Sequence, residues 1–424
     1  MAVPFSKIAS NEWYGTETDD DVAHRQSAKQ AFIADSALES PAIHYPKLRN
    51  EHVFDATERS YQALLDDAST DVEYTKAARR LAELYRHKEV MRGLGRTGVK
   101  AVLSHERAAM MSAEIFGEVD RDAYLGLVAK LRLQATELRD EMPEANDLLN
   151  MLGDAAPERK IQSAELEQEA LAVLREDIIE LFPGIDEVMT VDMDQEEISA
   201  RETLAQIEGA LAFFGLSEKG WKAELVPGSN KAASTDANTK IISIGELRAK
   251  LPPKQVIKTT FHEVLGHAFR AEGDISKASL SFEEGFAVAL EQIMTGEVRS
   301  GSGEQYYTAL GLQYGLDQDG QQRGHRETYE IMWRRNMVNA RANGQSLTED
   351  KAKDQAYTQV YRTRRGNAID TRDRSYFEGA RVVPEWLNDV AALPKAERQA
   401  TLKWVFSGRF DPTNEQQAAE YPRP

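Results

Sequence analysis

The chain has 424 residues, 41% of them hydrophobic and 29% charged, which is typical of a soluble globular protein with one large domain or two to three ordinary ones. Its 52 Lys and Arg residues against 70 Asp and Glu residues give a formal net charge of -18, which disfavours nucleic acid and anionic membranes as partners. The absence of cysteine excludes disulfides, thiolate nucleophiles and cysteine-bound zinc, so any metal site must use His, Asp or Glu.

The sequence also bears on location. It contains no apolar run as long as a membrane span, and its first residues, MAVPFSKIASNEWYG, lack a basic region followed by an apolar stretch. We therefore expect neither a membrane span nor a signal peptide. The expected location is the cytoplasm.

Helical patterns dominate the first half of the chain. Apolar residues recur at helical spacing in four segments, residues 71–92, 121–141, 164–181 and 195–214. We therefore predict a mainly helical N-terminal region over residues 1–215. Within it, GLGRTG at residues 93–98 matches the G-x-G-x-x-G dinucleotide fingerprint. It follows a charged amphipathic helix instead of a buried strand, so we do not expect a nucleotide site there.

The second region, residues 216–424, begins with the clearest strand pattern. From Trp221 to Ile244, short apolar-polar alternation broken by turn residues predicts a small β meander. Pro253 then lies in the first turn of a helix, where proline is tolerated, and that helix should end near Gly273. Further helices are expected from about Ser281, over 325–342 and over 351–362. The fold class is therefore mainly α with a small β-sheet, α+β.

The helix that Pro253 opens carries the sequence TFHEVLGHAF. Its histidines, His262 and His267, are five residues apart, whereas the H-E-x-x-H zinc motif places them four apart on one helix face. At about 100° per residue, the second imidazole would lie about 140° from the first. A π-type widening near Leu265 and Gly266 would return it to the same face, and such widenings are common at functional sites. The competing interpretation, two buried histidines without a ligand, is costly beside an ionisable glutamate.

A catalytic zinc needs a third protein ligand and an open position for water. The candidates are Glu283 and Glu284 in SFEEGFAVALEQ, early in the following helix. Adjacent helix positions point about 100° apart, so only one of the two can face the metal. The spacing from His267 allows a short loop and an antiparallel helix. Taken alone, the pair would be interpreted as a solvated first turn that the helix dipole favours.

The same residues resemble known peptidases. E-G-F-A is similar to the N-E-G-F-A of gluzincin aminopeptidases, in which the Glu before Gly binds zinc; by position this is Glu284. More closely, H-E-V-L-G-H with E-E-G-F-A resembles the family of the microtubule-associated tyrosine carboxypeptidase and its bacterial relatives with a Q-E-G-L-A motif. The resemblance extends to residues 362–366, like R-x-x-R-G, and 371–379, like T-K-D-x-x-Y-x-x-G, and covers mainly Lys240 to Ala380.

The resemblance implies a zincin-like metallopeptidase core, with one Zn²⁺ per chain held by His262, His267 and Glu284. Zinc lowers the pKa of its bound water toward about 7. Glu263 is then placed to take the proton of that water and pass it to the leaving amine. The family motif favours Tyr376 as the donor to the oxyanion. The alternative donor is His325, which could instead be a capping or surface residue.

The sequence departs from the family at three positions. Glu283 stands where many relatives have Gln, Arg372 where they have Lys, and Asn367 where they have a second Gly. We expect the metal chemistry to survive these changes. Substrate choice is more exposed to them, because Lys and Arg hold a carboxylate differently.

A carboxypeptidase must recognise a free carboxylate, for which the arginine fork is suited. An arginine cluster offers this fork: Arg362, Arg364, Arg365, Arg372 and Arg374. We expect substrate contacts from Arg362, Arg365, Arg372 and Lys240, against the interpretation of a solvated charged face. The strand around Lys240 to Ile244 could pair with an extended peptide.

The leading expectation is a zinc metallocarboxypeptidase acting on the C-terminus of peptides or proteins. One alternative is an aminopeptidase or oligopeptidase of gluzincin type. Another is a non-catalytic regulatory protein with a vestigial zinc site. The tubulin substrate of the named relative is not expected, because a chain of charge -18 repels an acidic tail. The sequence does not indicate an oligomeric state.

Overall fold

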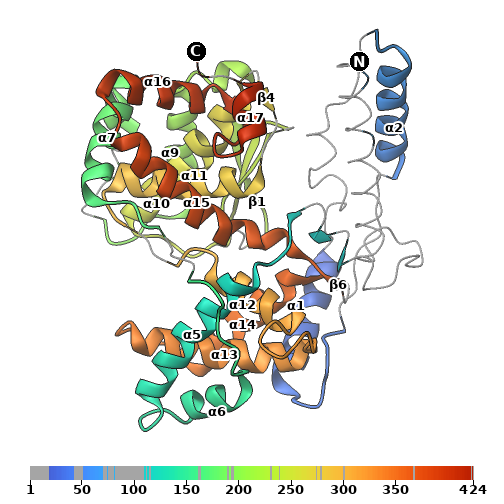
Figure 1. Cartoon of the computed structure of the whole chain (residues 1–424). Coiled ribbons are helices and arrows are strands. Elements are labelled where there is room, and N and C mark those ends of the chain that lie inside the picture. The colour runs from blue at the N-terminus through green and yellow to red at the C-terminus, as the bar shows by residue number, and fades with distance from the viewer. Residues whose placement is uncertain are drawn as a thin grey trace. The chain divides into compact units, whose positions relative to one another are not determined.

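The structure is a computed structural model (Figure 1). It describes residues 19–42 and 51–69, residues 74 and 81, and residues 109–423 without 111, 114–115, 161–163, 189–190, 192–194, 230–231, 238, 274, 277–278, 299–300, 366–367 and 422. The GLGRTG segment and nearly all of the helix predicted at 71–92 lie outside the described residues. Among the described helices, none combines the length and apolar character that crossing a membrane requires.

The chain folds into two compact units, each made of two stretches of sequence. The first unit comprises residues 1–161 and 303–374, and the second unit comprises residues 162–302 and 375–424. The units interleave along the chain, whereas the sequence interpretation divided it once, after residue 215. The helices between residues 168 and 213 share one hydrophobic core with the sheet and the motif helix, which is why they belong to the second unit.

The first unit is almost entirely helical. Its central helix α13 (His325–Ala342) packs most extensively against α5 (Arg121–Leu138), α6 (Pro143–Met151) and α14 (Glu349–Thr363). The remaining elements are α1 (Asp19–Ala34), α2 (Glu51–Asp66), α12 (Glu304–Tyr314), β5 (Arg364–Arg365), β6 (Ala368–Ile369) and the 3₁₀ turn η5 (Thr371–Asp373). The helices expected at 325–342 and 351–362 are confirmed.

The second unit contains a small sheet surrounded by helices. Its elements up to the motif are α7 (Gln168–Leu181), α8 (Ile185–Val188), α9 (Ala200–Phe213), η3 (Ser217–Lys219), β1 (Lys222–Val226), β2 (Ser234–Asp236), β3 (Ile241–Gly245) and α10 (Pro253–Thr260). After these come the π-helix η4 (Phe261–Phe269), β4 (Ile275–Ser276), α11 (Leu280–Thr295), α15 (Arg374–Ala391), α16 (Lys395–Phe406), β7 (Gly408–Arg409) and α17 (Glu415–Glu420). The protein is thus mainly helical with a small β component.

The strand order in the three-stranded sheet is β1-β3-β2. β3 pairs in parallel with β1 and antiparallel with β2, so that Thr235 lies opposite Ile242. The expected meander is therefore wrong, because a meander joins neighbouring strands antiparallel throughout. The strands themselves lie within the segment that the alternation predicted.

Glycines allow the helices near the motif to pack closely. A Cβ at Gly266 would lie 2.7 Å from the Cβ of Ala287, so η4 and α11 meet there without a side chain between them. A Cβ at Gly285 would lie 2.4 Å from the carbonyl oxygen of Gly379, which brings α11 equally close to α15. These contacts hold α11 between the two neighbouring helices.

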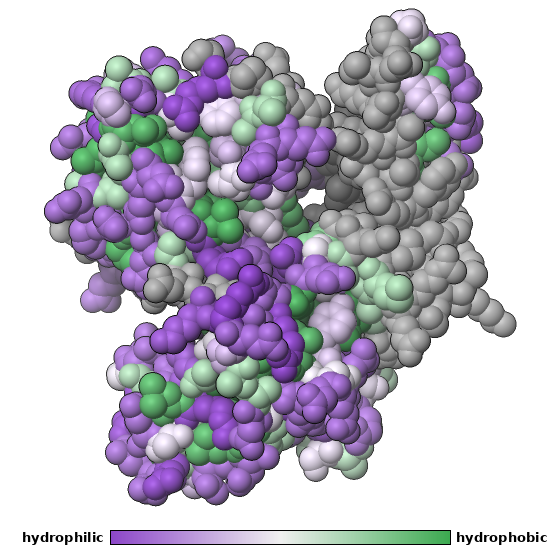
Figure 2. Space-filling model, in the orientation of Figure 1, coloured by the Kyte–Doolittle hydropathy of each residue, from purple (hydrophilic) through white to green (hydrophobic). Residues whose placement is uncertain are grey.

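Apolar side chains from η4 and α11 fill the core between these elements. The buried set includes Phe261, Val264, Leu265, Phe286 and Leu290. On the face of the molecule that Figure 2 displays, hydrophilic residues predominate and hydrophobic ones form only small islands. The apolar residues of the motif are therefore accounted for by packing, which leaves its polar residues to be explained.

Candidate metal centre

The predicted π-type widening is present. The segment Phe261–Phe269 forms a π-helix that continues directly from α10. One π turn advances the chain by about one residue more than an α turn, so residues five apart return to the same face. His262 and His267 consequently lie together, with their rings edge to face and their centroids 4.9 Å apart.

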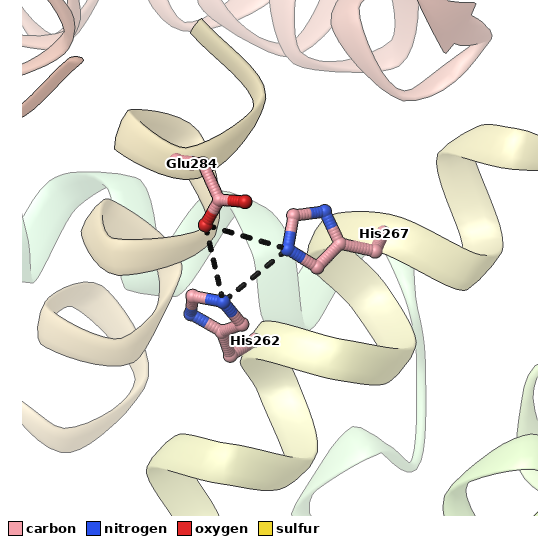
Figure 3. A group of neighbouring side chains, drawn as sticks. All are labelled: His262, His267 and Glu284. Atoms are coloured by element: carbon pink, nitrogen blue, oxygen red, sulfur yellow. Dashed lines mark hydrogen bonds and ion pairs between the residues drawn. The ribbon is translucent and has the colours of Figure 1, made fainter. Parts of the chain in front are cut away.

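Two imidazoles and one carboxylate converge at this point (Figure 3). The Nε2 atoms of His262 and His267 are 3.2 Å apart, and the Oε2 of Glu284 lies 3.8 Å from the first and 3.9 Å from the second. Zinc bonds of about 2.0 to 2.2 Å in tetrahedral geometry separate ligand atoms by about 3.3 to 3.5 Å. The three donor atoms are therefore close to the spacing of a facial zinc triad, and small movements would complete it.

The surroundings of the triad suit a metal with an open coordination position. The three side chains are 14 to 18% exposed, so the site is enclosed yet reachable by water and small groups. Among the described residues, this is the one group of His, Asp and Glu side chains whose potential ligand atoms meet in this way. The donor set of two nitrogens and one oxygen is a typical one for catalytic zinc.

Glu291, on α11, orients the first histidine. Its Oε1 lies 2.7 Å from the Nδ1 of His262, so the proton of the neutral ring belongs on Nδ1 and the Nε2 lone pair faces the triad. Burial lowers the pKa of His262, but the hydrogen bond with Glu291 and the charges of Glu263 and Glu284 outweigh it and raise the pKa to about 9. The negative charge that attracts a proton would attract a metal cation equally.

Glu283 lies on the other side of the triad, behind His267. Its Oε2 is 3.9 Å from the Nδ1 of His267, an electrostatic contact that is too long for a hydrogen bond. The buried carboxylate is held by Arg270 at 2.5 Å and by Arg409 at 3.3 Å. Burial raises the pKa of Glu283, but the two arginines and His267 outweigh it and lower the pKa to about 2. Glu284, not Glu283, therefore faces the two Nε2 atoms.

Arg270 fixes this arrangement to the C-terminal part of the unit. The side chain is fully buried, donates to the carbonyl oxygens of Val405 and Phe410, and lies over the rings of Phe282 and Phe286. Together these contacts satisfy a charge that would otherwise be costly to bury.

Glu263 lies beside the triad and touches the sheet. It is 6% exposed, and its Oε2 accepts a hydrogen bond of 2.6 Å from the hydroxyl of Thr235 in β2. The same hydroxyl is 3.2 Å from the backbone oxygen of Glu263. Thr235 thus orients the carboxylate of Glu263.

The two candidate oxyanion donors lie in different units. Tyr376 is partly buried in the first turn of α15, in the second unit, three residues before the Gly379 that packs against Gly285. His325 is buried in the first unit, where its ring packs edge to face with Phe32. Burial and the charges of nearby arginines lower its pKa to about 3. His325 is thus neither a cap nor a surface residue.

Two of the four expected carboxylate-binding residues are engaged within the protein. Arg362, on α14, forms a two-bond ion pair with Asp373 at 2.7 and 3.0 Å and lies over the ring of Tyr306. Lys240 pairs with Glu272 at 2.7 Å. The two remaining arginines, Arg365 in β5 and the exposed Arg372 in η5, belong like Arg362 to the first unit. The three arginines thus belong to a different unit from the triad, whereas Lys240 belongs to the same unit as the triad.

The strand expected to pair with a peptide is also occupied. β3 is the central strand, and its residues 241–243 have partners on both sides. Strand addition at Lys240 to Ile244 is therefore wrong for this segment, because both edges already carry hydrogen bonds. The outer strand on the side of Glu263 is β2.

Sequence reasoning missed several residues of the centre. Glu291 follows Glu284 by two helical turns and so lies on the same face of α11, a spacing that could have identified it. The roles of Thr235, Arg270 and Arg409 depend on contacts between distant segments, for which the sequence carries no local signal. No family model, curated protein or solved structure matches the chain.

Proposed function

We propose that the chain is a zinc-dependent peptidase, and specifically a metallocarboxypeptidase. The observation that carries the proposal is the convergence of His262, His267 and Glu284, with the carboxylate of Glu263 next to the first ligand. Two neutral nitrogens and a carboxylate are the ligands expected of catalytic zinc, and the spacing of the donor atoms fits the ion. The resemblance of the motifs to a family of carboxypeptidases supports the choice of reaction.

A zinc ion bound here would supply a water of lowered pKa and polarise the scissile carbonyl. The carboxylate of Glu263, oriented by Thr235, would take the proton from that water and transfer it to the leaving amine. Glu291 keeps the proton of His262 on Nδ1, so that Nε2 remains a ligand throughout. Tyr376 donates to the oxyanion, a role that its place on α15 near the start of α11 supports.

The substrate would extend along β2. This outer strand lies next to η4, and its Thr235 bonds to Glu263. A peptide added to its outer edge would be held by main-chain hydrogen bonds, which demand no particular sequence. Such binding suits an enzyme that shortens many different chains.

The test is a peptide library of diverse C-termini, read by mass spectrometry with zinc and with a chelator. We expect metal-dependent loss of C-terminal residues from free-acid peptides and none from their amidated counterparts. Glu263→Gln should keep the metal and lower the rate by about 10² to 10⁴-fold, since it loses a general base. Cleavage of amidated peptides at the N-terminus or internally would instead indicate an aminopeptidase or oligopeptidase. Purified protein without stoichiometric metal, or an equally active Glu263→Gln, would overturn the proposal.

A further inference from the structure

The loop between β3 and α10, residues 246–251, is tied to neighbouring segments by backbone hydrogen bonds. The backbone amide of Leu247 donates to the carbonyl of Ser229 at 2.8 Å, and that of Arg248 donates to Gly245 at 3.2 Å. At its far end, Leu251 forms a β-bridge with Ile198. The backbone of this loop is therefore tied down at both ends.

Arg248 has a donor with no acceptor. Its Nη1 is buried and finds no hydrogen-bond partner among the described residues. A buried donor without a partner is costly, and a guanidinium more so, unless a ligand supplies the acceptor. By contrast, two of the residues that the sequence predicted to bind the substrate carboxylate already pair with acids of the protein. Lys240 pairs with Glu272, and Arg362 pairs with Asp373.

Arg248 also lies within electrostatic reach of the proposed general base. Burial lowers the pKa of its guanidinium, and the charge of Glu263 acts in the opposite direction. The two groups nevertheless form no ion pair within 4.0 Å in the part of the chain that the structure describes. The arginine is therefore near Glu263 but not neutralised by it.

Leu247, the neighbour of Arg248, is 65% exposed. The other large hydrophobic side chains with comparable exposure among the described residues all belong to the first unit. One exposed apolar side chain next to one unsatisfied cation is the combination that recognises a terminal residue, with an apolar contact for its side chain and a fork for its carboxylate.

We propose that Arg248 binds the free α-carboxylate of a peptide substrate, with Leu247 against the terminal side chain. The inference rests on the proposed peptidase function and supplies the specificity that Arg362 and Lys240 were expected to provide. Arginine suits the task because two parallel N–H donors match both carboxylate oxygens.

The first experiment measures binding without catalysis. Matched peptides ending in a free acid or an amide are titrated calorimetrically into the metal-free protein with chelator present. The parent should bind the free acid at least about tenfold more tightly, and Arg248→Gln should abolish the difference, since the fork is lost. Lys250→Gln is the matched control, because it removes one exposed cation from the same loop and should leave the difference intact.

The second experiment measures kcat and KM on the free-acid peptide with zinc, and the amide serves as the control that should resist cleavage. Arg248→Gln should raise KM for the free acid by about 10 to 100-fold with little change in kcat, and Arg248→Lys should recover part of the loss. A thermal melt like that of the parent establishes that the variants fold. An unchanged KM for the free acid in Arg248→Gln, or no acid preference in the metal-free parent, would overturn the inference. A parent that cleaves neither peptide while still preferring the acid in calorimetry would defeat the peptidase proposal alone.

Discussion

A hydrogen bond of 2.7 Å joins Oε1 of Glu291 to Nδ1 of His262. Glu291 follows Glu284, whose carboxylate completes the metal triad, by two turns of the same helix. The bond fixes both the tautomer and the orientation of the imidazole, so the ring reaches the ligand position before any metal arrives. Partners of this kind commonly contribute about 10 to 100-fold to metal affinity.

Glu291→Gln should therefore weaken zinc binding within that range while leaving the fold intact. The amide can still accept a hydrogen bond, but it removes a negative charge behind the ring. Zinc affinity is measured by competition with a chromogenic chelator, and cobalt substitution gives an absorption spectrum that reports ligand geometry. Glu297→Gln is the control, since Glu297 pairs with Lys254 and Lys258. Equal zinc affinities of the Glu291 variant and the parent would contradict the role of Glu291 in orienting His262.

The contact between Gly266 and Ala287 predicts a packing-dependent metal site. In Gly266→Ala the new Cβ would lie 2.7 Å from that of Ala287, so η4 must move away from α11, which carries Glu284. We expect a loss of about 1 to 3 kcal/mol in the free energy of unfolding and weaker zinc binding. Ala287→Gly in the same protein should restore both.

Gly209 provides the control for that substitution. It is also helical, in the second unit, and a Cβ there would meet no atom within 4 Å. Gly209→Ala should therefore stabilise the protein by about 0.5 to 1 kcal/mol, because alanine favours the helix. If Gly266→Ala behaves like Gly209→Ala in urea unfolding, the close packing of η4 on α11 is wrong.

The buried carboxylate of Glu283 predicts a strong energetic coupling with Arg409. Glu283→Gln leaves Arg270 buried without its counter-charge, and removing one partner of a buried pair costs about 3 to 5 kcal/mol. Arg409→Gln should cost less, because Arg270 still holds the carboxylate. In the double variant the combined loss should be smaller than the sum, as urea unfolding of all four proteins would measure. Additive losses within about 0.5 kcal/mol would show that Arg409 and Glu283 do not interact.

Because His325 is buried, we predict that the folded first unit loses stability as the pH falls. Its folded-state pKa of about 3 lies below the ordinary value of 6.5, because burial and the neighbouring charges of Arg364 and Arg326 oppose a proton. A neutral buried histidine is stable above pH 6.5. Below that pH the unfolded chain takes up a proton that the folded chain refuses. Stability is therefore lost at up to about 1.4 kcal/mol per pH unit as the pH falls from 6.5 toward 3.

The measurement compares the parent with His325→Phe, whose ring suits the contact with Phe32. Urea unfolding is followed by circular dichroism at several pH values between 7 and 4. Other titrating groups affect both proteins alike, so they cancel in the difference between the two. As the pH falls, the free energy of unfolding of the variant should increase relative to that of the parent. A difference that stays constant with pH would contradict a neutral His325.

Much of the second unit can be predicted from local patterns. His262 and His267 are five residues apart, so their imidazoles can lie on one face of the helix only if the helix is of the π type. The π-helix is present. Proline and glycine mark the ends of the motif helix because their effects act within a few residues. The small sheet was predicted from alternation alone, but its parallel pair was not, since pairing of β1 with β3 depends on the path of the chain between them.

The charged residues were harder to assign. Arg270 follows the motif like an ordinary surface cation, yet it is fully buried among Phe282, Phe286 and two distant carbonyl groups. Arg362 carries the side chain that a substrate carboxylate requires, but Asp373 takes the fork. Which arginine stays unsatisfied is decided by the neighbours that folding brings to it, and these neighbours are far away in sequence.

The contacts of Arg270 also constrain the order of assembly during translation. The carbonyls of Val405 and Phe410 that accept its protons lie 135 and 140 residues downstream. At about 5 to 20 residues per second, the ribosome needs about 7 to 28 seconds to reach them after making Arg270. Through that interval the guanidinium must stay hydrated, and the helix behind the triad cannot dock in its final position. The stretch 303–374, which belongs to the first unit, emerges before those acceptors, so the unit that starts later in the chain is also the last to close.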